Sequence, residues 1–368
     1  MSLAILMTNL YSIVVFLIVL SILIIVHEWG HFMTAIKLGV RVESFSIGFG
    51  PKLFKKVIGG VEYCVSLFPL GGYVKMAGES REDCKGAPDE FHSKPPECRA
   101  LIAINGPIVN FLLAYLCFVV VFLIGYPDFS TKVGQVMKDF PAQQAGLLVG
   151  DRIVKINKQP VTNWTEVKKS ITNPAFDKLD LEITRNGKPL DLTLVPRFEE
   201  QKNVFGQKQK TRLIGIVPAD ELVSLKYGLG QSLVLGFTKI VEITEMTYKS
   251  IYFMITGSMS AKNVAGPVMI FKIIKEAAAM GFNHLVFIVG VISASLAIFN
   301  LLPIIPLDGG HLLLMAIEKV RGKPLPEKMD EIVGNAGFVL IICFALFVFY
   351  NDFENIGLIA KIKSLFIR

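Results

Sequence analysis

Charged side chains are absent from four long stretches of this sequence. Only 19% of the 368 residues are Asp, Glu, Lys or Arg, whereas 52% are hydrophobic, and the mean hydropathy of +0.53 excludes an ordinary soluble protein. Each uncharged stretch approaches the length of about 20 residues that a membrane-spanning helix requires. The sequence therefore predicts a polytopic α-helical membrane protein whose four transmembrane helices cover residues 9–26, 100–124, 285–307 and 332–350.

Basic residues are also missing before the first uncharged stretch, and no small-x-small cleavage site follows it. This pattern favours a retained span over a cleaved secretory leader. The loops at residues 32–99 and 308–331 hold ten and four basic residues, which predicts that both loops are cytosolic. Both termini and the segment 125–284 are then expected on the extracytoplasmic side. This bias and anionic lipid account for the net charge of +7, and no nucleic-acid motif is visible, so no nucleic-acid partner is expected.

Cysteine is scarce, with five residues in the chain and none between positions 125 and 284. The segment predicted to lie outside therefore has no disulfide framework. Cys84, His92 and Cys98 could be read as a metal site, but their spacing matches no standard zinc pattern. A metal transporter is disfavoured, because the second and fourth uncharged stretches contain no acidic or His residue.

The first uncharged stretch ends in the motif His27-Glu28-Trp29-Gly30-His31. On a helix, positions i and i+4 lie on one face, so His27 and His31 can bind one ion, and Glu28 is placed to hold a water on that ion. The alternative is a pair of hydrogen-bonded histidines beside a glutamate that reaches toward the lipid surface. Ionisable residues in a transmembrane helix are rare and usually functional, which favours a metal.

A third metal ligand is expected at the end of the third uncharged stretch. A catalytic zinc takes three protein ligands and leaves one position for water. Asp308 follows that stretch at the same expected depth as His27 and His31, and metal coordination gives its charge a reason to lie there. Pro303 and Pro306 would open the helix and free backbone groups beside the ion.

Two further segments have strand-like or polar patterns. Residues 61–76 alternate enough to predict a membrane-associated β-hairpin turned around Pro69 to Gly72, which could present an edge strand to a peptide; a plain loop is the alternative. In the second uncharged stretch, Asn105 and Asn110 are expected to hydrogen-bond a neighbouring helix.

Residues 126–218 are soluble in composition and rich in short strands and turns. A strand is predicted at 133–137 and a helix at 164–171, and Asn186-Gly187 is a strong hairpin signal. The run AGLLVGDRIVKIN, with the elements after it, resembles a PDZ domain. The resemblance implies an inserted α+β domain that binds a chain end by strand addition, with residues 212–216 as its peptide-binding loop.

Two helices with polar stripes are predicted between this segment and the third uncharged stretch. Residues 229–256 place Lys and Glu side chains three or four positions apart on an apolar body, which favours an amphipathic helix along the membrane over a fifth span. A second such helix follows Gly266-Pro267. The chain thus divides into the first half of a membrane core, a PDZ-like segment, surface helices and the second half of the core, at residues 1–125, 126–218, 219–284 and 285–368.

The order of these motifs resembles that of the site-2 protease family. HEWGH in the first stretch, GGYVKM after it, NGPIVNF in the second stretch, one PDZ-like segment and NLLPIIPLDGG in the third stretch together cover essentially the whole chain. The order is most similar to the bacterial regulator of sigma-E protease subgroup. One departure is that the best-known members of that subgroup carry two tandem PDZ domains, whereas one is readable here.

The resemblance implies an intramembrane zinc endopeptidase of the bacterial inner membrane, with its active site near the cytosolic face. Its implied substrates are single-pass membrane proteins such as anti-sigma factors or remnant signal peptides. It implies Zn²⁺ ligands His27, His31 and Asp308, the general base Glu28, and the substrate-holding residues Gly71, Gly72, Tyr73 and Asn300. The alternative function is a membrane PDZ adaptor with a structural metal, although a structural zinc normally has four ligands and needs no glutamate beside it.

Overall fold

The computed structural model describes residues 3–203, 205–324 and 326–357. Its contacts divide the chain into two compact units, each with its own core. Unit 1 comprises Met1–Val120, Leu233–Tyr248 and Ala261–Arg368, and unit 2 comprises Val121–Ser232 and Lys249–Ser260.

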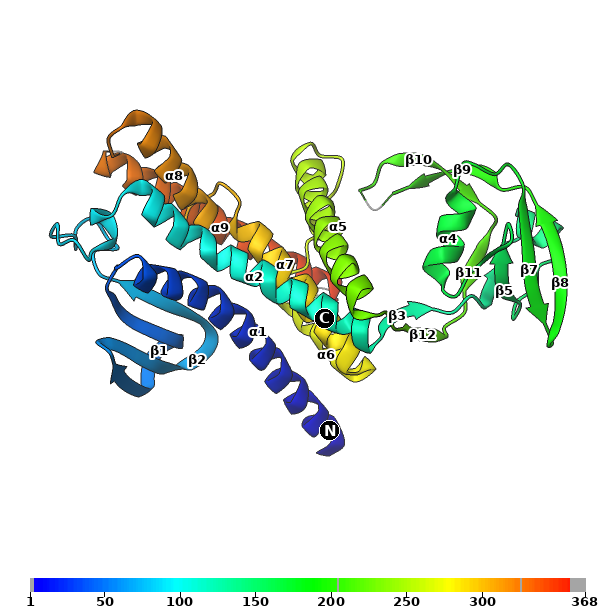
Figure 1. The fold of residues 1–368 in the computed structure, drawn as a ribbon, viewed down its shortest axis with the longest axis horizontal. Helices are drawn as coiled ribbons and strands as arrows, with labels where there is room; N and C mark the ends of the chain where they lie inside the picture. Colours follow the sequence, from blue (N-terminus) through cyan, green and yellow to red (C-terminus); the bar gives the residue numbers. More distant parts are fainter. Residues whose placement is uncertain (1–2, 204, 325, 358–368) are drawn as a thin grey trace, which may run out of the picture. The chain divides into compact units, whose positions relative to one another are not determined.

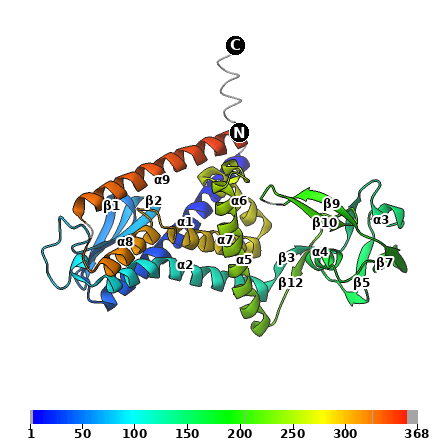
Figure 2. The same cartoon turned by 90° about the horizontal axis from the view of Figure 1, so that it is seen from above.

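Four helices within the described residues are long and apolar enough to cross a membrane, as the sequence predicts. They are α1 (Leu3–Lys37), α2 (Pro96–Ile124), α7 (Phe282–Asn300) and α9 (Glu327–Asn355). Figure 2 shows α9 running along the outside of the other helices of unit 1, and most of its apolar side chains are exposed. Such a surface is suited to lipid, because lipid tails are as apolar as the side chains that they cover.

The third of these helices is shorter than the sequence predicts. α7 ends at Asn300 rather than at residue 307, because Pro303 and Pro306 lack the amide hydrogen that would continue the helix. The chain turns through these prolines and starts a separate helix, α8 (Asp308–Arg321), whose first residue is the acidic one. The opening of the helix before Asp308 is therefore present, as predicted.

Helices α5 (Leu229–Ile255) and α6 (Pro267–Met280) form at the two places where polar stripes predict helices. α5 is not among the helices that meet the length and hydropathy of a span. α6 packs against α1 and α7 in a cluster around the buried side chains of Val19, Leu23 and Ile274.

A glycine on α1 allows the backbone of α2 to approach closely. A Cβ atom at Gly30 would lie 2.5 Å from the carbonyl oxygen of Asn105, a distance that real Cβ atoms do not tolerate. At the same place Asn105 Nδ2 donates a hydrogen bond of 3.1 Å to the carbonyl oxygen of Gly30. The prediction that Asn105 bonds a neighbouring helix is confirmed.

Two long antiparallel strands, β1 (Val42–Ile58) and β2 (Val61–Met76), lie against the C-terminal half of α1 (Figures 1 and 2). Both strands bend back on themselves, so that β1 pairs with β2 twice. Ser46, for example, pairs with Cys64 on one side and with Tyr73 on the other. The buried faces of Phe45 and Val74 pack on Phe32 of α1 and close this core.

The predicted hairpin within residues 61–76 is wrong in its pairing. Its two arms do not pair with each other, because residues 44–47 of β1 lie between them. The tight turn is instead at Gly59-Gly60, where both residues have positive φ and Ile58 pairs with Val61. Two consecutive glycines satisfy a two-residue hairpin turn better than a segment with Pro69, which lacks an amide hydrogen.

Unit 2 is built from short strands around helix α4 (Trp164–Thr172). A four-stranded sheet has the order β6-β5-β7-β8, and β4 (Val133–Val136) pairs with β11 (Ile216–Pro218) in a second sheet. The hairpin at Asn186-Gly187 joins β7 (Leu179–Arg185) to β8 (Lys188–Leu194), as predicted. The other sheet strands are β5 (Arg152–Ile156) and β6 (Gln159–Pro160), the short helix is α3 (Pro141–Gln144), and two further pairs are β3 (Tyr126–Phe129) with β12 (Leu222–Leu225) and β9 (Arg197–Lys202) with β10 (Lys208–Leu213).

Candidate metal centre

Two histidines of α1 and one aspartate of α8 meet inside unit 1. Ligand atoms of His27, His31 and Asp308 all lie within 4.8 Å of one another. The two histidines are one helical turn apart, so both imidazoles point to the same side of α1. Asp308 joins them because α7 ends at Asn300 and the proline-containing turn brings the first residue of α8 back to α1.

The distances within this cluster match those between the ligands of one ion. Nε2 of His27 lies 3.2 Å from Nε2 of His31 and 3.2 Å from Oδ2 of Asp308, and Nε2 of His31 lies 3.6 Å from Oδ1 of Asp308. A tetrahedral zinc with bonds of about 2.0–2.2 Å separates its ligand atoms by about 3.3–3.6 Å. The three side chains therefore have the spacing and the donor chemistry of a zinc site.

An unpartnered carboxylate oxygen in the cluster supports the same fit. Oδ2 of Asp308 is buried and has no hydrogen-bond partner, although His27 lies at ion-pair distance. Both imidazoles are also buried, with 8% and 9% of their residue surface exposed. A buried oxygen anion without a donor is unfavourable, and a cation between the three side chains removes that cost.

A backbone carbonyl group of helix α2 orients the imidazole of His31. Nδ1 of His31 donates a hydrogen bond of 2.8 Å to the backbone carbonyl oxygen of Ile102, because a carbonyl oxygen can only accept. The proton is therefore on Nδ1, and Nε2 keeps the lone pair that a metal needs. On the same helix, Nδ2 of Asn110 lies 3.3 Å from Nδ1 of His27.

A glycine of α2 leaves the space that the two imidazoles occupy. A Cβ atom at Gly106 would lie 2.3 Å from Nε2 of His31 and 2.9 Å from Cε1 of His27. Any larger residue would push on both imidazoles. The sequence shows Gly106 and Asn110 in an uncharged helix, but it contains no signal that either one touches a histidine.

Glu28 and Asn300 lie at the rim of the cluster. Asn300, the last residue of α7, has its Nδ2 3.4 Å from Nε2 of His27. The side chain of Glu28 lies beside Gly72 of β2, where a Cβ atom would be 3.6 Å from Cγ of Glu28. The carboxylate of Glu28 also accepts a hydrogen bond from the backbone of Val74. Strand β2 thus reaches the residue beside the first histidine.

The remaining predicted substrate-holding residues are in the same strand but have a different neighbour. Tyr73 stacks on Phe49 of β1, with ring centroids 6.0 Å apart. A Cβ atom at Gly71 would lie 2.1 Å from the Phe49 ring. Gly71 and Tyr73 therefore shape the turn of the sheet, whereas Gly72 faces α1.

Cys84, His92 and Cys98 do not form a second centre, because the cluster of His27, His31 and Asp308 is the one group with metal-ligand spacing among the described residues. The Cys84 thiol instead donates to the carboxylate of Glu90.

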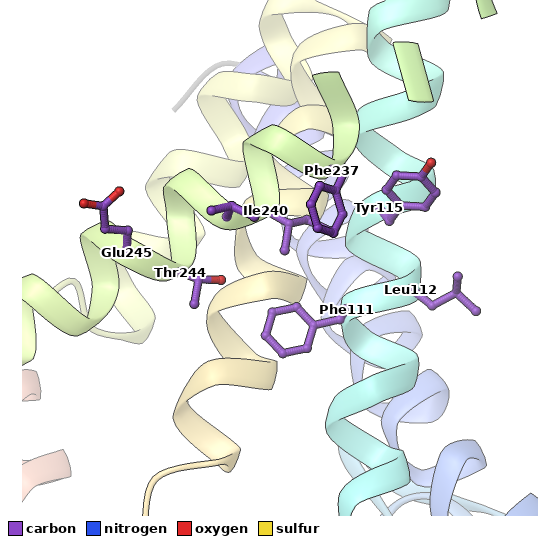
Figure 3. A pocket seen from close by; sticks show the side chains of 8 residues that line it. Phe111, Leu112, Tyr115, Phe237, Ile240, Thr244 and Glu245 are labelled. Carbon is purple, nitrogen blue, oxygen red and sulfur yellow. The ribbon is translucent and has the colours of Figure 1, made fainter. Parts of the chain in front are cut away.

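An apolar groove of about 640 Å³ lies on another face of α2, where α5 passes it (Figure 3). The rings of Phe111, Tyr115 and Phe237 line it, together with aliphatic side chains of both helices. His27, His31 and Asp308 do not line this groove, so the groove and the metal cluster are separate features of unit 1.

Comparison with known proteins agrees with this geometry. The chain is 34% identical to a protein of Mesorhizobium japonicum over 93% of this chain and 98% of the relative, and 35% identical to one of Clostridium acetobutylicum over 93% and 97%. It is 32% identical to a protein of Campylobacter jejuni over 92% of each chain. Each of these relatives carries a provisional name as a zinc metalloprotease.

A family model also covers most of the chain. Residues 15–344 match the model of peptidase family M50, and this range includes both histidines, the glutamate between them and Asp308. With that coverage, and with relatives that align over nearly their full length, the chain belongs to peptidase family M50.

Proposed function

We propose that this protein is a zinc metalloendopeptidase of the site-2 protease type, which hydrolyses peptide bonds within membrane-spanning segments of other proteins. The observation that carries the proposal is the meeting of His27, His31 and Asp308, from two helices, with Glu28 directly beside the first ligand. The names of the relatives supply zinc as the metal. Three ligands leave a coordination position for chemistry.

The residues divide the work as follows. His27, His31 and Asp308 hold the zinc, which when bound polarises the scissile carbonyl and makes a water more acidic. Glu28 accepts the proton of the attacking water and then passes it to the leaving amine as general acid.

The substrate must be unwound before it is cut, since the peptide bonds of an intact helix are shielded by its own turns. Strand β2 reaches Glu28 at Gly72, so an extended substrate segment that pairs with this part of the sheet is delivered beside the general base. The amide of Asn300, next to His27, donates to a substrate carbonyl that has lost its helical partner.

Unit 2 acts in this proposal as a single PDZ domain that binds the exposed chain end of a substrate. The antiparallel pairing of β11 with β4, the packing of helix α4 against β10 and the positive φ of Gly215 before β11 support this assignment. The substrates are then single-pass membrane proteins, of the anti-sigma factor or remnant signal-peptide kind, in the bacterial inner membrane. In this proposal the metal centre lies toward the cytosolic face and unit 2 lies outside, and the excess of basic residues in the loops at 32–99 and 308–331 supports that orientation.

The test separates metal binding from catalysis. Glu28→Gln keeps the ligands but removes the base, so it should retain zinc and lose proteolysis, whereas His31→Ala or Asp308→Ala should lose both. The measurements are the zinc content of the purified full-length protein and the cleavage of a membrane-spanning reporter. Undiminished cleavage by Glu28→Gln would refute the general-base role. An unsubstituted protein that binds zinc but leaves the reporter intact would instead favour an adaptor with a structural metal.

A further inference from the structure

We infer that Asn110 orients the first zinc ligand: its side-chain carbonyl accepts the Nδ1 proton of His27 and so keeps Nε2 free for the metal. The inference rests on the proposed function, because it concerns how the same metal is held. Asn110 is fully buried on α2, and its side chain is the neighbour that the structure gives to Nδ1 of His27, at 3.3 Å.

The two histidines need the same proton arrangement. A neutral imidazole carries its proton on one nitrogen, and only the other nitrogen can bind a metal. For His31 the carbonyl oxygen of Ile102 fixes the proton on Nδ1. For His27 the corresponding partner is Asn110, and no backbone carbonyl is described at that position.

The amide of Asn110 can face His27 in two orientations of nearly equal shape. With Nδ2 toward His27, the amide donates to Nδ1, so His27 must carry its own proton on Nε2, where it blocks the metal. Oδ1 of Asn110 is then buried without a hydrogen-bond partner. With the amide rotated by 180°, Oδ1 accepts from Nδ1 and Nδ2 takes the unpartnered place.

Either orientation leaves one buried amide atom without a partner, so the hydrogen-bond count does not decide between them. The metal decides. Only the orientation with Oδ1 toward His27 gives a lone pair at Nε2, which lies 3.2 Å from both Nε2 of His31 and Oδ2 of Asp308. A carbonyl or carboxylate behind a metal-bound imidazole is also the usual arrangement in zinc sites.

The position of Asn110 is itself fixed by a third helix. The hydroxyl of Ser293 on α7 donates a hydrogen bond of 2.8 Å to the backbone carbonyl oxygen of Asn110, and both residues are fully buried. The same helix ends at Asn300, beside His27. Asn110 is therefore a positioning residue that connects α7 and α2 to the ligand on α1.

The test compares an acceptor with an isosteric apolar side chain. Asn110→Asp keeps an oxygen acceptor and has no donor, and Asn110→Leu has neither. We expect Asn110→Leu to weaken zinc binding by about 10–100-fold and Asn110→Asp to bind zinc within about threefold of the unsubstituted protein. The readout is the zinc dissociation constant of the full-length protein in detergent, stripped of metal and titrated against a chelator of known affinity.

Asn351→Leu is the matched control. Asn351 is also a buried asparagine of a membrane-type helix with no described side-chain hydrogen bond. It lies near the C-terminal end of α9, whereas the residue of α9 that approaches the turn before Asp308 is Gly337, next to Ile305. This variant should leave the zinc dissociation constant unchanged. If Asn110→Leu does not fold, Asn110→Ser replaces it, because a serine hydroxyl is too short to reach Nδ1 of His27.

Two results would overturn the inference: Asn110→Leu or Asn110→Ser with unchanged zinc affinity, or Asn110→Asp as weak as Asn110→Leu. Failure of the proposed function gives a different pattern: the unsubstituted protein would show no zinc binding that His31→Ala abolishes, or it would bind zinc and leave the membrane-spanning reporter uncut.

Discussion

The metal centre needs a glycine at position 106, because the two imidazoles occupy the space that a side chain would fill. Replacement by Ala adds a Cβ atom 2.3 Å from Nε2 of His31, so the imidazoles or helix α2 must move. Ala is also the better helix former by about 1 kcal/mol, so the helix itself is not weakened. We therefore expect Gly106→Ala to lower zinc affinity at least about tenfold and to lower proteolysis.

Gly334→Ala in α9 provides the comparison for that experiment. Gly334 is also a helical glycine, but a Cβ atom there would meet nothing within 4 Å. Zinc affinity should be unchanged and stability equal or higher. Equal zinc affinities for the two alanine variants would show that the close approach at Gly106 is relieved at no cost to the site.

The sequence predicts the metal cluster better than its surroundings, for a physical reason. The spacing of His27 and His31 is local, and a helix converts it directly into a shared face. Asp308 is predictable because a charge at the end of an apolar segment needs a partner. Gly106 and Asn110 act through a helix–helix contact, and no local pattern reveals which face of α2 meets α1.

An ion pair between α2 and α8 holds the helix that carries the third ligand, Asp308. Arg99 near the start of α2 and Glu318 near the end of α8 form an ion pair of 2.6 Å, with 5% and 14% of the side chains exposed. Arg99→Met leaves the carboxylate of Glu318 buried without its partner. The free energy of unfolding should fall by about 3–5 kcal/mol.

Denaturant unfolding of the full-length protein in detergent measures this change. The exposed pair Lys262–Glu354 is the control, and Lys262→Met should cost less than about 1 kcal/mol because both side chains are solvated. An equally small effect of Arg99→Met would mean that the pair does not hold α8 on α2.

The short helix η1 (Phe91–Ser93) before α2 gives the molecule a pH-dependent element. Burial, together with the positive charges of Arg99 and Arg81, lowers the pKa of His92 from its ordinary value of 6.5 to about 4. Between these two pH values the unfolded segment binds more protons than the folded one. Its stability should therefore fall as the pH drops from 6.5 toward 4, and should be insensitive to His92 above 6.5.

Amide hydrogen exchange of residues 78–98 at several pH values tests this expectation. His92→Gln removes the titrating group, so the difference between the two proteins isolates His92 from the carboxylates that titrate in the same range. A pH dependence that is identical in both proteins would contradict the assignment.

In the sheet that packs on α1, the strands could be predicted from the sequence but their pairing could not. The alternation in residues 61–76 correctly indicates extended chain, but the pairing depends on β1, whose segment with Phe45 and Ile47 inserts between the two predicted arms. Strand content follows from local pattern, whereas the partner of a strand follows from which apolar faces cover α1. The span lengths have the same limit, since α7 ends at its prolines and α1 continues to Lys37.

The distribution of basic residues predicts how the whole molecule is oriented in the membrane. In a variant with the native cysteines replaced by Ser, a cysteine restored at position 84 should react with a membrane-impermeant maleimide only after the cells are permeabilised. Lys178→Cys, on an exposed loop of unit 2, should react in intact cells. The opposite pattern would reverse the proposed topology and put the metal centre at the other membrane face.

The distance along the chain between the ligands has a consequence for the cell that makes this protein. His27 and His31 leave the ribosome early, but Asp308 follows only after most of the chain has been synthesised. A nascent chain therefore holds an incomplete ligand set while its first helices enter the bilayer. The proposed protease is thus harmless to its neighbours during its own biogenesis and becomes competent only when its last helices arrive.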